Sequence, residues 1–189
     1  MKDPLKILLF TSLICFSVAG PVFADGHLAA AGERLSKTCA SCHGTDGAAP
    51  GKLIPIIGGQ VAPYLNTALQ EFASGERPGS VMANLAKGYD ADEQILIAAF
   101  FAAKPWVNTS HASAISVNES ELKSCQGCHG KAGQGQGVFP RLAGQHPEYL
   151  LEALLEYKKA ERKAATMMLV RGVDEGKLKV FADNYAAMK

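Results

Sequence analysis

The fold is decided by two short stretches, Cys39-Ala40-Ser41-Cys42-His43-Gly44 and Cys125-Gln126-Gly127-Cys128-His129-Gly130. Two cysteines three positions apart, followed directly by a histidine, are typical of a site where a haem is attached through two thioether bonds. One helical turn presents both sulfur atoms along one edge of the haem and places the histidine ring beneath the iron. The sequence therefore predicts two haem c groups. Their covalent attachment points are Cys39, Cys42, Cys125 and Cys128, and His43 and His129 are the predicted iron ligands.

Three other interpretations of the cysteine pairs are a zinc site, a thioredoxin-like dithiol and structural disulfides. A zinc site could use all four cysteines, but it would not require a histidine after each pair. A dithiol redox motif follows a strand in an α/β pattern, and the sequence shows no convincing strand alternation. A disulfide across so short a spacing adds little stability. Haem attachment therefore explains the pattern best.

The chain is an internal duplication with a shift of 85 or 86 positions. The segment 54–60 aligns with 139–145, Tyr64-Leu65 with Tyr149-Leu150, and Glu76-Arg77 with Glu161-Arg162. Two copies of about 80 residues favour two small domains over one large core. The predicted domain boundaries are 25–104 for the first domain, 105–116 for the linker and 117–189 for the second domain.

Each copy shows apolar residues at helical spacing. The predicted helices cover 28–39, 63–72, 90–101, 147–159 and 174–187, with prolines or aspartates near the start of four of them. Domains this small bury little apolar surface, so a covalently held haem would complete each core. The predicted fold is all-α, with two tandem domains that each wrap around one haem.

The first 24 residues have the pattern of a secretory signal peptide. Lys2 and Lys6 precede an apolar run over 7–18, and the segment ends in small residues up to Ala24. The run is shorter than the roughly 20 residues that a membrane span needs. We therefore predict cleavage after Ala24, a periplasmic location and no membrane span in the mature chain.

Cleavage also changes the charge balance. The chain has 19 basic and 18 acidic residues, and loss of Lys2, Lys6 and Asp3 leaves 17 of each. A balanced charge gives no indication of nucleic-acid binding, which usually shows as a basic excess. Because Cys15 is removed as well, every cysteine of the mature chain falls in one of the two motifs.

The second axial ligand of each iron is predicted to be a methionine, because a neutral thioether favours reduced iron and suits an electron carrier. Met82 is the candidate in the first copy. The ungapped repeat places Met167 opposite Met82, and Met168 is the alternative in the second copy. The remaining histidines, at 27, 111 and 146, have no counterpart in the other copy, so we predict that they are solvated rather than bound to iron.

Two further repeated features suggest supporting roles. Pro55 and Pro140 form a rigid turn that could place a carbonyl near the imidazole N–H of His43 or His129 and fix its tautomer. The Gly-Gln pairs at 59–60 and 144–145 are expected to let the chain approach the haem closely and to cap the following helix.

With these residues assembled, the chain resembles the dihaem class I cytochromes c over nearly the whole mature sequence. Two groups are similar, cytochrome c4 and the cytochrome subunit of flavocytochrome c sulfide dehydrogenase, and both share the 142–145 segment Leu-Ala-Gly-Gln followed by Tyr149-Leu150. The 82–89 segment Met-Ala-Asn-Leu-Ala-Lys-Gly-Tyr looks closer to the second group, which typically has Met-x-x-Ile-Ala-Lys-Gly-Tyr there. The second copy departs from both groups, since its stretch 170–174 is short.

The resemblance implies an electron-transfer protein without a catalytic site of its own. In the sulfide dehydrogenase group the haem subunit accepts electrons from a separate flavoprotein that carries FAD, which is the partner we favour. In the cytochrome c4 group a free carrier delivers electrons to a terminal oxidase, which is the alternative. A dihaem peroxidase would need an open iron position, and the two available methionines argue against it.

Overall fold

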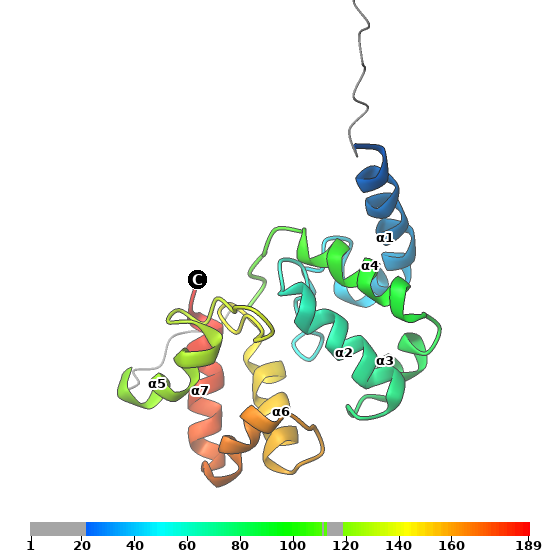
Figure 1. Ribbon diagram of the computed structural model, residues 1–189. Coiled ribbons are helices and arrows are strands. Elements are labelled where there is room, and N and C mark those ends of the chain that lie inside the picture. Colours follow the sequence, from blue (N-terminus) through cyan, green and yellow to red (C-terminus); the bar gives the residue numbers. More distant parts are fainter. Residues whose placement is uncertain (1–21, 111, 113–118) are drawn as a thin grey trace, which may run out of the picture.

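The computed structural model describes residues 22–110, 112 and 119–189. Most of the predicted signal peptide, His111 and part of the predicted linker lie outside the described residues. The first domain contains four helices: α1 (Val22–His43), α2 (Ala62–Ser74), α3 (Ser80–Ala86) and α4 (Ala91–Ala102). Helix α4 packs against both α1 and α2, and α3 packs against α2 (Figure 1).

The second domain repeats this arrangement with α5 (Glu119–His129), α6 (Pro147–Lys158), the 3₁₀ helix η1 (Ala165–Gly172) and α7 (Glu175–Ala187). Helix α6 packs against α7 and η1. Between residues 22 and 189, the described segments contain no strand, and the one β-type contact is an isolated bridge between Gln136 and Phe139. The predicted all-α class is confirmed.

The helix boundaries follow local sequence signals. Asp90 starts α4 with a capping box, because its Oδ1 accepts from the Glu93 N–H at 2.9 Å and Glu93 Oε2 accepts from the Asp90 N–H at 3.0 Å. Asp174 caps α7 by accepting from two backbone N–H groups. Pro63 and Pro147 occupy the first turn of α2 and α6, where a missing N–H costs nothing.

Each domain has its own apolar core beside its last helix. In the first domain, the buried side chains come from α2 and α4, and Phe101 is 1% exposed. In the second domain, they come from α5, α6 and α7. The two cores consist of Leu65, Ile97, Ala98 and Phe101, and of Leu122, Leu150, Ala182, Tyr185 and Ala186.

The two domains meet through a reciprocal pair of arginine–tyrosine contacts. Arg77 Nη2 donates to the Tyr149 hydroxyl at 2.8 Å, and Arg162 Nη2 donates to the Tyr64 hydroxyl at 2.9 Å. The two arginines occupy equivalent positions of the repeat, and so do the two tyrosines. The interface therefore has an approximate twofold symmetry. Both arginines are buried, and burial of a charged group requires partners of this kind.

The chain between the domains also crosses this interface. Thr109 Oγ1 donates to the Ala49 carbonyl at 2.6 Å, and His146 Nε2 donates to the same oxygen at 2.8 Å. His146 is 3% exposed, so the prediction that it is solvated is wrong. The repeat aligns His146 with Val61, which gave no hint of its burial, because its hydrogen-bond partner lies in the other copy.

Candidate haem sites

Both Cys-x-x-Cys-His motifs lie in the last turn of a helix. Helix α1 ends at His43 and α5 ends at His129, and each is followed by a glycine, Gly44 with φ of 78° and Gly130 with φ of 86°. This left-handed conformation, which glycine adopts without a steric penalty, turns the chain back after the helix. Each helix therefore delivers two cysteines and a histidine to one end of its domain.

The first cysteine of each motif packs against the core of its own domain. Cys39 contacts the first core and Cys125 contacts the second. Burial raises the pKa of the Cys39 thiol. None of the four motif cysteines forms a disulfide. Within the described ranges, no three His, Cys, Asp or Glu side chains gather into a group that could hold a metal ion.

The two motif histidines are held in the same way. His43 Nδ1 donates to the Pro55 carbonyl at 2.9 Å, and His129 Nδ1 donates to the Pro140 carbonyl at 2.8 Å. Because a carbonyl can only accept, the proton of each neutral ring lies on Nδ1 and Nε2 keeps its lone pair. The predicted role of the two prolines is confirmed.

Burial supports the same protonation state. His43 is 7% exposed and His129 is 5% exposed. Burial lowers the pKa of both imidazoles, although the carbonyl acceptors act in the opposite direction. Both rings are therefore neutral near pH 7, which is the form that binds a metal through Nε2.

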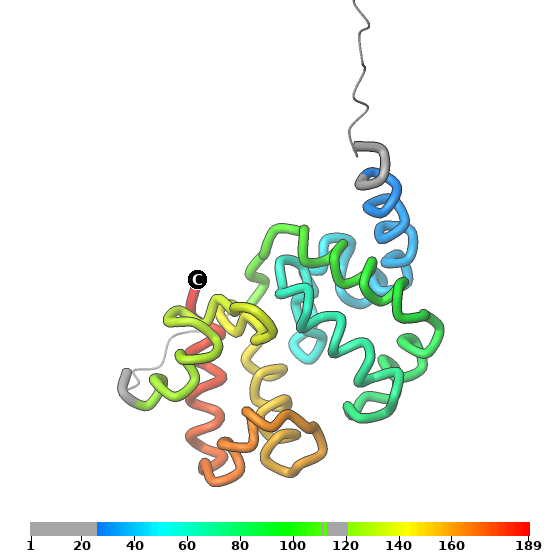
Figure 2. Tube along the Cα trace, in the orientation of Figure 1, coloured from blue at the N-terminus to red at the C-terminus, as the bar shows by residue number. Residues whose placement is uncertain are grey.

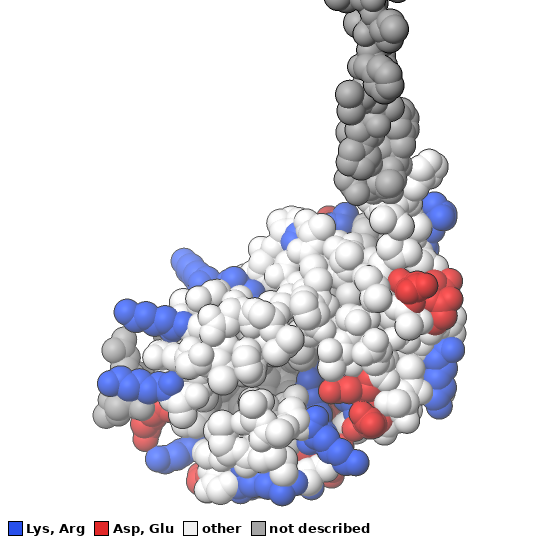
Figure 3. All heavy atoms as spheres, viewed as in Figure 1, with Lys and Arg blue, Asp and Glu red and all other residues white. Residues whose placement is uncertain are grey.

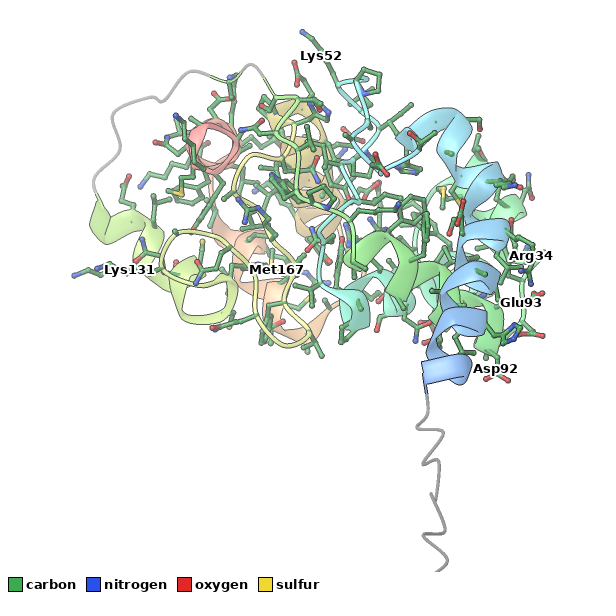
Figure 4. The ribbon with its side chains drawn as sticks, turned by 90° about the horizontal axis from the view of Figure 1, so that it is seen from above. Arg34, Lys52, Asp92, Glu93, Lys131 and Met167 are labelled. Carbon is green, nitrogen blue, oxygen red and sulfur yellow. The ribbon has the colours of Figure 1, made fainter. Side chains whose placement is uncertain are left out.

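The methionines lie on the equivalent short helices of the two domains. Met82 is on α3 and Met167 is on η1, and both side chains are partly buried. The N-caps of the two helices, Gly79 and Ala164, are 85 positions apart, so the repeat keeps its register up to this point. Met168 is partly buried as well. In Figure 4, Met167 lies within the second domain, whereas Lys131 extends away from it.

These residues fit a covalently attached haem on three counts. Each motif offers two cysteines outside any disulfide and one neutral imidazole, each domain offers a partly buried methionine, and the first cysteine of each motif adjoins an apolar core. A haem bound there would receive sulfur and nitrogen ligands of the kind found in electron carriers.

Two glutamines connect the sites across the domain interface, and the sequence patterns did not predict this. Gln145 Oε1 accepts from the Ile56 N–H and its Nε2 donates to the Ile56 carbonyl, both at 2.9 Å. Gln60 Oε1 accepts from the Arg141 N–H at 2.7 Å, and its Nε2 donates to the Arg141 carbonyl at 3.0 Å. The repeated position of the two glutamines was visible in the sequence, but their partners lie in the other copy.

The expectation that the Gly-Gln pairs cap the following helix is wrong, because neither α2 nor α6 has a side-chain cap bond. Gly59 instead donates its N–H to the Phe101 carbonyl at 2.9 Å, and Gly144 donates to the Tyr185 carbonyl at 3.0 Å. A side chain at either glycine would meet Trp106 in the chain between the domains. The glycines therefore admit this connecting chain.

Comparison with known proteins places the chain in a family. The cytochrome c family matches residues 29–96 and 120–183, which is more than half of the sequence, and the chain belongs to this family. It is 27% identical to cytochrome c4 of Azotobacter vinelandii over 175 residues, which cover 82% of this chain and 83% of the relative. It is 49% identical over 70 residues to the cytochrome subunit of sulfide dehydrogenase of Chlorobaculum tepidum, covering 37% of this chain and 63% of the relative.

A solved structure extends the similarity. Thiosulfate dehydrogenase from Marichromatium purpuratum matches with a TM-score of 0.74 and 25% identity, covering 85% of this chain and 40% of that chain. The chain is thus a dihaem class I cytochrome c that transfers electrons and carries two haem c groups, one in each domain. No helix in the described part of the chain is long and apolar enough to cross a membrane.

Proposed function

We propose that this chain is the periplasmic haem subunit that accepts electrons from a flavoprotein sulfide dehydrogenase. The observation that carries this proposal is the 49% identity over 70 residues with the cytochrome subunit of sulfide dehydrogenase, against 27% over 175 residues with cytochrome c4. The Lys-Gly-Tyr sequence at 87–89 supports the same choice. The relation to a thiosulfate dehydrogenase adds a second dehydrogenase of a reduced sulfur compound to the set of similar proteins.

A free carrier of the cytochrome c4 type is the second candidate. It is favoured by the coverage of the comparison, because the Azotobacter vinelandii protein aligns along 82% of this chain. In that case electrons would pass to a terminal oxidase, and no flavoprotein would remain bound.

In this proposal Cys39 and Cys42 attach the first haem, and Cys125 and Cys128 attach the second. His43 with Met82 and His129 with Met167 bind the two irons, with Met168 as the alternative to Met167. Each iron supplies a one-electron couple, and two protein ligands leave no open position for a substrate. The Pro55 and Pro140 carbonyls hold each histidine ring in place. The domains extend over 25–104 and 117–189, joined by 105–116.

Co-purification tests the choice of partner. The protein is expressed from its native host with a tag at its C-terminus, and the fraction it captures is examined for a polypeptide with the absorption spectrum of bound flavin. We expect such a polypeptide, and sulfide should then reduce both haems of the captured complex. Isolation of the cytochrome alone, with rapid electron transfer to a terminal oxidase and none from sulfide, would replace this proposal with the free carrier.

Far-red absorption tests the ligands. The methionine-to-iron charge-transfer band should correspond to two methionine-ligated haems in the unaltered protein. Met82→Ala and Met167→Ala should each reduce it by half, and Met168→Ala should leave it unchanged. Halving by Met168→Ala and not by Met167→Ala would transfer the role to Met168. N-terminal sequencing of the periplasmic protein tests the predicted cleavage, and the first residue should be Asp25.

A further inference from the structure

The peptide group that holds each motif histidine is itself held by the opposite domain. The Pro55 carbonyl accepts from His43 Nδ1, and the N–H of the same peptide group belongs to Ile56. This N–H donates to Gln145 Oε1 at 2.9 Å. Gln145 is therefore one peptide group away from the histidine of the other domain.

The second site has the same construction. The Pro140 carbonyl accepts from His129 Nδ1, and the N–H of that peptide group, on Arg141, donates to Gln60 Oε1 at 2.7 Å. Figure 2 shows the two loops that carry these contacts, coloured cyan and yellow, next to each other between the domains. Each domain therefore supplies one glutamine that binds the peptide group beside the histidine of the other domain.

Both glutamines are buried, and both the oxygen and the nitrogen of each side chain are hydrogen-bonded. Gln60 is 4% exposed and Gln145 is 2% exposed. Each side-chain oxygen also accepts from the N–H of the next residue, Val61 at 2.9 Å and His146 at 3.0 Å. These local bonds fix the orientation of each side-chain amide, so the amide has little freedom to move where it contacts the other domain.

A hydrogen bond to the N–H of a peptide group polarises that group and makes its carbonyl oxygen a stronger acceptor. A stronger acceptor at Nδ1–H makes the imidazole a more basic ligand, and a basic ligand stabilises ferric over ferrous iron. Each glutamine should therefore lower the reduction potential of the haem bound by the histidine at the far end of this chain of bonds.

We propose that Gln60 and Gln145 are crossed positioning residues: Gln145 tunes the haem of the first domain, and Gln60 tunes the haem of the second domain. The proposal rests on the haem ligands given under the proposed function. It gives the domain interface a redox role, because separation or rotation of the domains would change both potentials at once.

The test is a redox titration of purified holoprotein carrying Gln145→Met or Gln60→Met, which replaces the amide with an apolar chain of similar length. Double-cysteine variants that retain one haem assign the two potentials. Gln145→Met should shift the reduction equilibrium of the first haem by about threefold toward the ferrous state, or about 28 mV at 59 mV per tenfold change, and leave the second haem unchanged. Gln60→Met should do the reverse.

Gln94→Met is the matched control. Gln94 is also 4% exposed and donates from Nε2 to two backbone carbonyls, Ala86 and Tyr89, but both lie in its own domain. Gln94 lies in the same domain as Gln60, so this variant should lose a similar amount of stability without the shift in the second haem that Gln60→Met produces. A Gln145→Met shift confined to the second haem, or no shift in either haem, would overturn the proposal.

The outcome is independent of the partner. The titration uses neither a flavoprotein nor an oxidase, so failure to find a partner leaves the crossed shifts measurable. An error in the ligand assignment would appear first as a missing far-red band in the unaltered protein. If Gln145→Met fails to fold, Ile56→Pro removes the same N–H from the other side of the interface and should raise the potential of the first haem alone.

Discussion

The two domains are copies of one unit, and they differ most in the segment that carries the methionine. In the first domain this segment is an α-helix, α3, followed by a four-residue turn to α4. In the second domain it is the 3₁₀ helix η1, which runs to Gly172, and α7 begins at Glu175. The second copy is one residue shorter here, since the last helices begin 84 rather than 85 positions apart. A 3₁₀ helix is longer per residue than an α-helix, so η1 extends further along its axis and leaves fewer residues for the turn before α7.

Most contacts that reach the histidines or the other domain are shared by both copies. The His–Pro bonds, the glutamine bonds and the arginine–tyrosine bonds occur in both copies with distances that agree within a few tenths of an ångström. The outer surfaces are free to diverge. Residues 25–104 carry 6 basic and 8 acidic side chains, whereas residues 117–189 carry 11 and 9. Figure 3 shows lysine and arginine side chains along the outer edge of the second domain. The duplication thus keeps the interior and varies the face shown to a partner.

The largest expected effect is loss of one haem. Cys39→Ser with Cys42→Ser should reduce the covalently bound haem from two per chain to one, and Cys125→Ser with Cys128→Ser should do the same. The haem that remains should keep its far-red band, because each domain supplies its own ligands. Haem staining after denaturing electrophoresis and a haem-to-protein ratio measure this. Loss of both haems from either variant would mean that the two domains cannot mature independently.

Substitution of the two glycines that contact the connecting chain, Gly59 and Gly144, should lower the free energy of unfolding by different amounts. A side chain at Gly59 would meet the backbone nitrogen of Trp106 at 2.7 Å, whereas at Gly144 it would meet side-chain atoms, Asn108 Nδ2 at 2.9 Å and Trp106 Nε1 at 3.0 Å. Both glycines have positive φ, 68° and 72°, which costs an alanine about 1 to 2 kcal/mol. Gly59→Ala should therefore lower the free energy of unfolding by about 3 kcal/mol and Gly144→Ala by about 2 kcal/mol.

Denaturant unfolding of the two holoproteins measures this difference. Gly75→Ala is the control, since Gly75 also has a positive φ, 81°, but a methyl group there would have no other atom within 4 Å. It should cost only the backbone strain of the left-handed conformation. Equal losses for Gly59→Ala and Gly75→Ala would show that the connecting chain moves aside freely.

Much of this structure follows from short-range sequence signals. The motif pairs predicted the two domains, Asp90 and Asp174 predicted the starts of the last helices, and the prolines at 55 and 140 predicted the histidine acceptors. The contacts across the domain interface escaped prediction, and they join residues 60 to 98 positions apart, such as Gln145 with Ile56 and His146 with Ala49. A pattern within one copy cannot reveal a partner in the other, because it carries no information on how the two copies pack together.

The arginine–tyrosine pairs should respond equally if the interface symmetry is real. Tyr64→Phe leaves Arg162 without its hydroxyl acceptor, and Tyr149→Phe does the same to Arg77. A hydrogen bond to a charged group contributes about 1.5 to 3 kcal/mol, so each variant should lose about 2 kcal/mol of stability. The ring stacking of Arg77 on Phe72 and of Arg162 on Tyr157 is kept in both.

Thermal or denaturant unfolding checks this, with Tyr89→Phe as a control inside one domain, where the hydroxyl donates to the Leu35 carbonyl at 3.3 Å. A clearly larger loss for Tyr64→Phe would identify Arg162 as the costlier of the two buried charges. That result would agree with its Nε atom, which is buried without a hydrogen-bond partner among the described residues.

The smallest expected difference lies at the start of the last helices. Asp90 takes part in a reciprocal capping box with Glu93, whereas Asp174 accepts from two N–H groups and forms no such box. Asp90→Ala should cost about 1.5 kcal/mol and Asp174→Ala about 1 kcal/mol, since loss of an N-cap costs about 0.5 to 2 kcal/mol. Glu93→Gln should retain most of the box because an amide oxygen also accepts from the Asp90 N–H. If Asp174→Ala proved the more damaging, the shorter turn before α7 would depend on its cap more than the hydrogen bonds alone indicate.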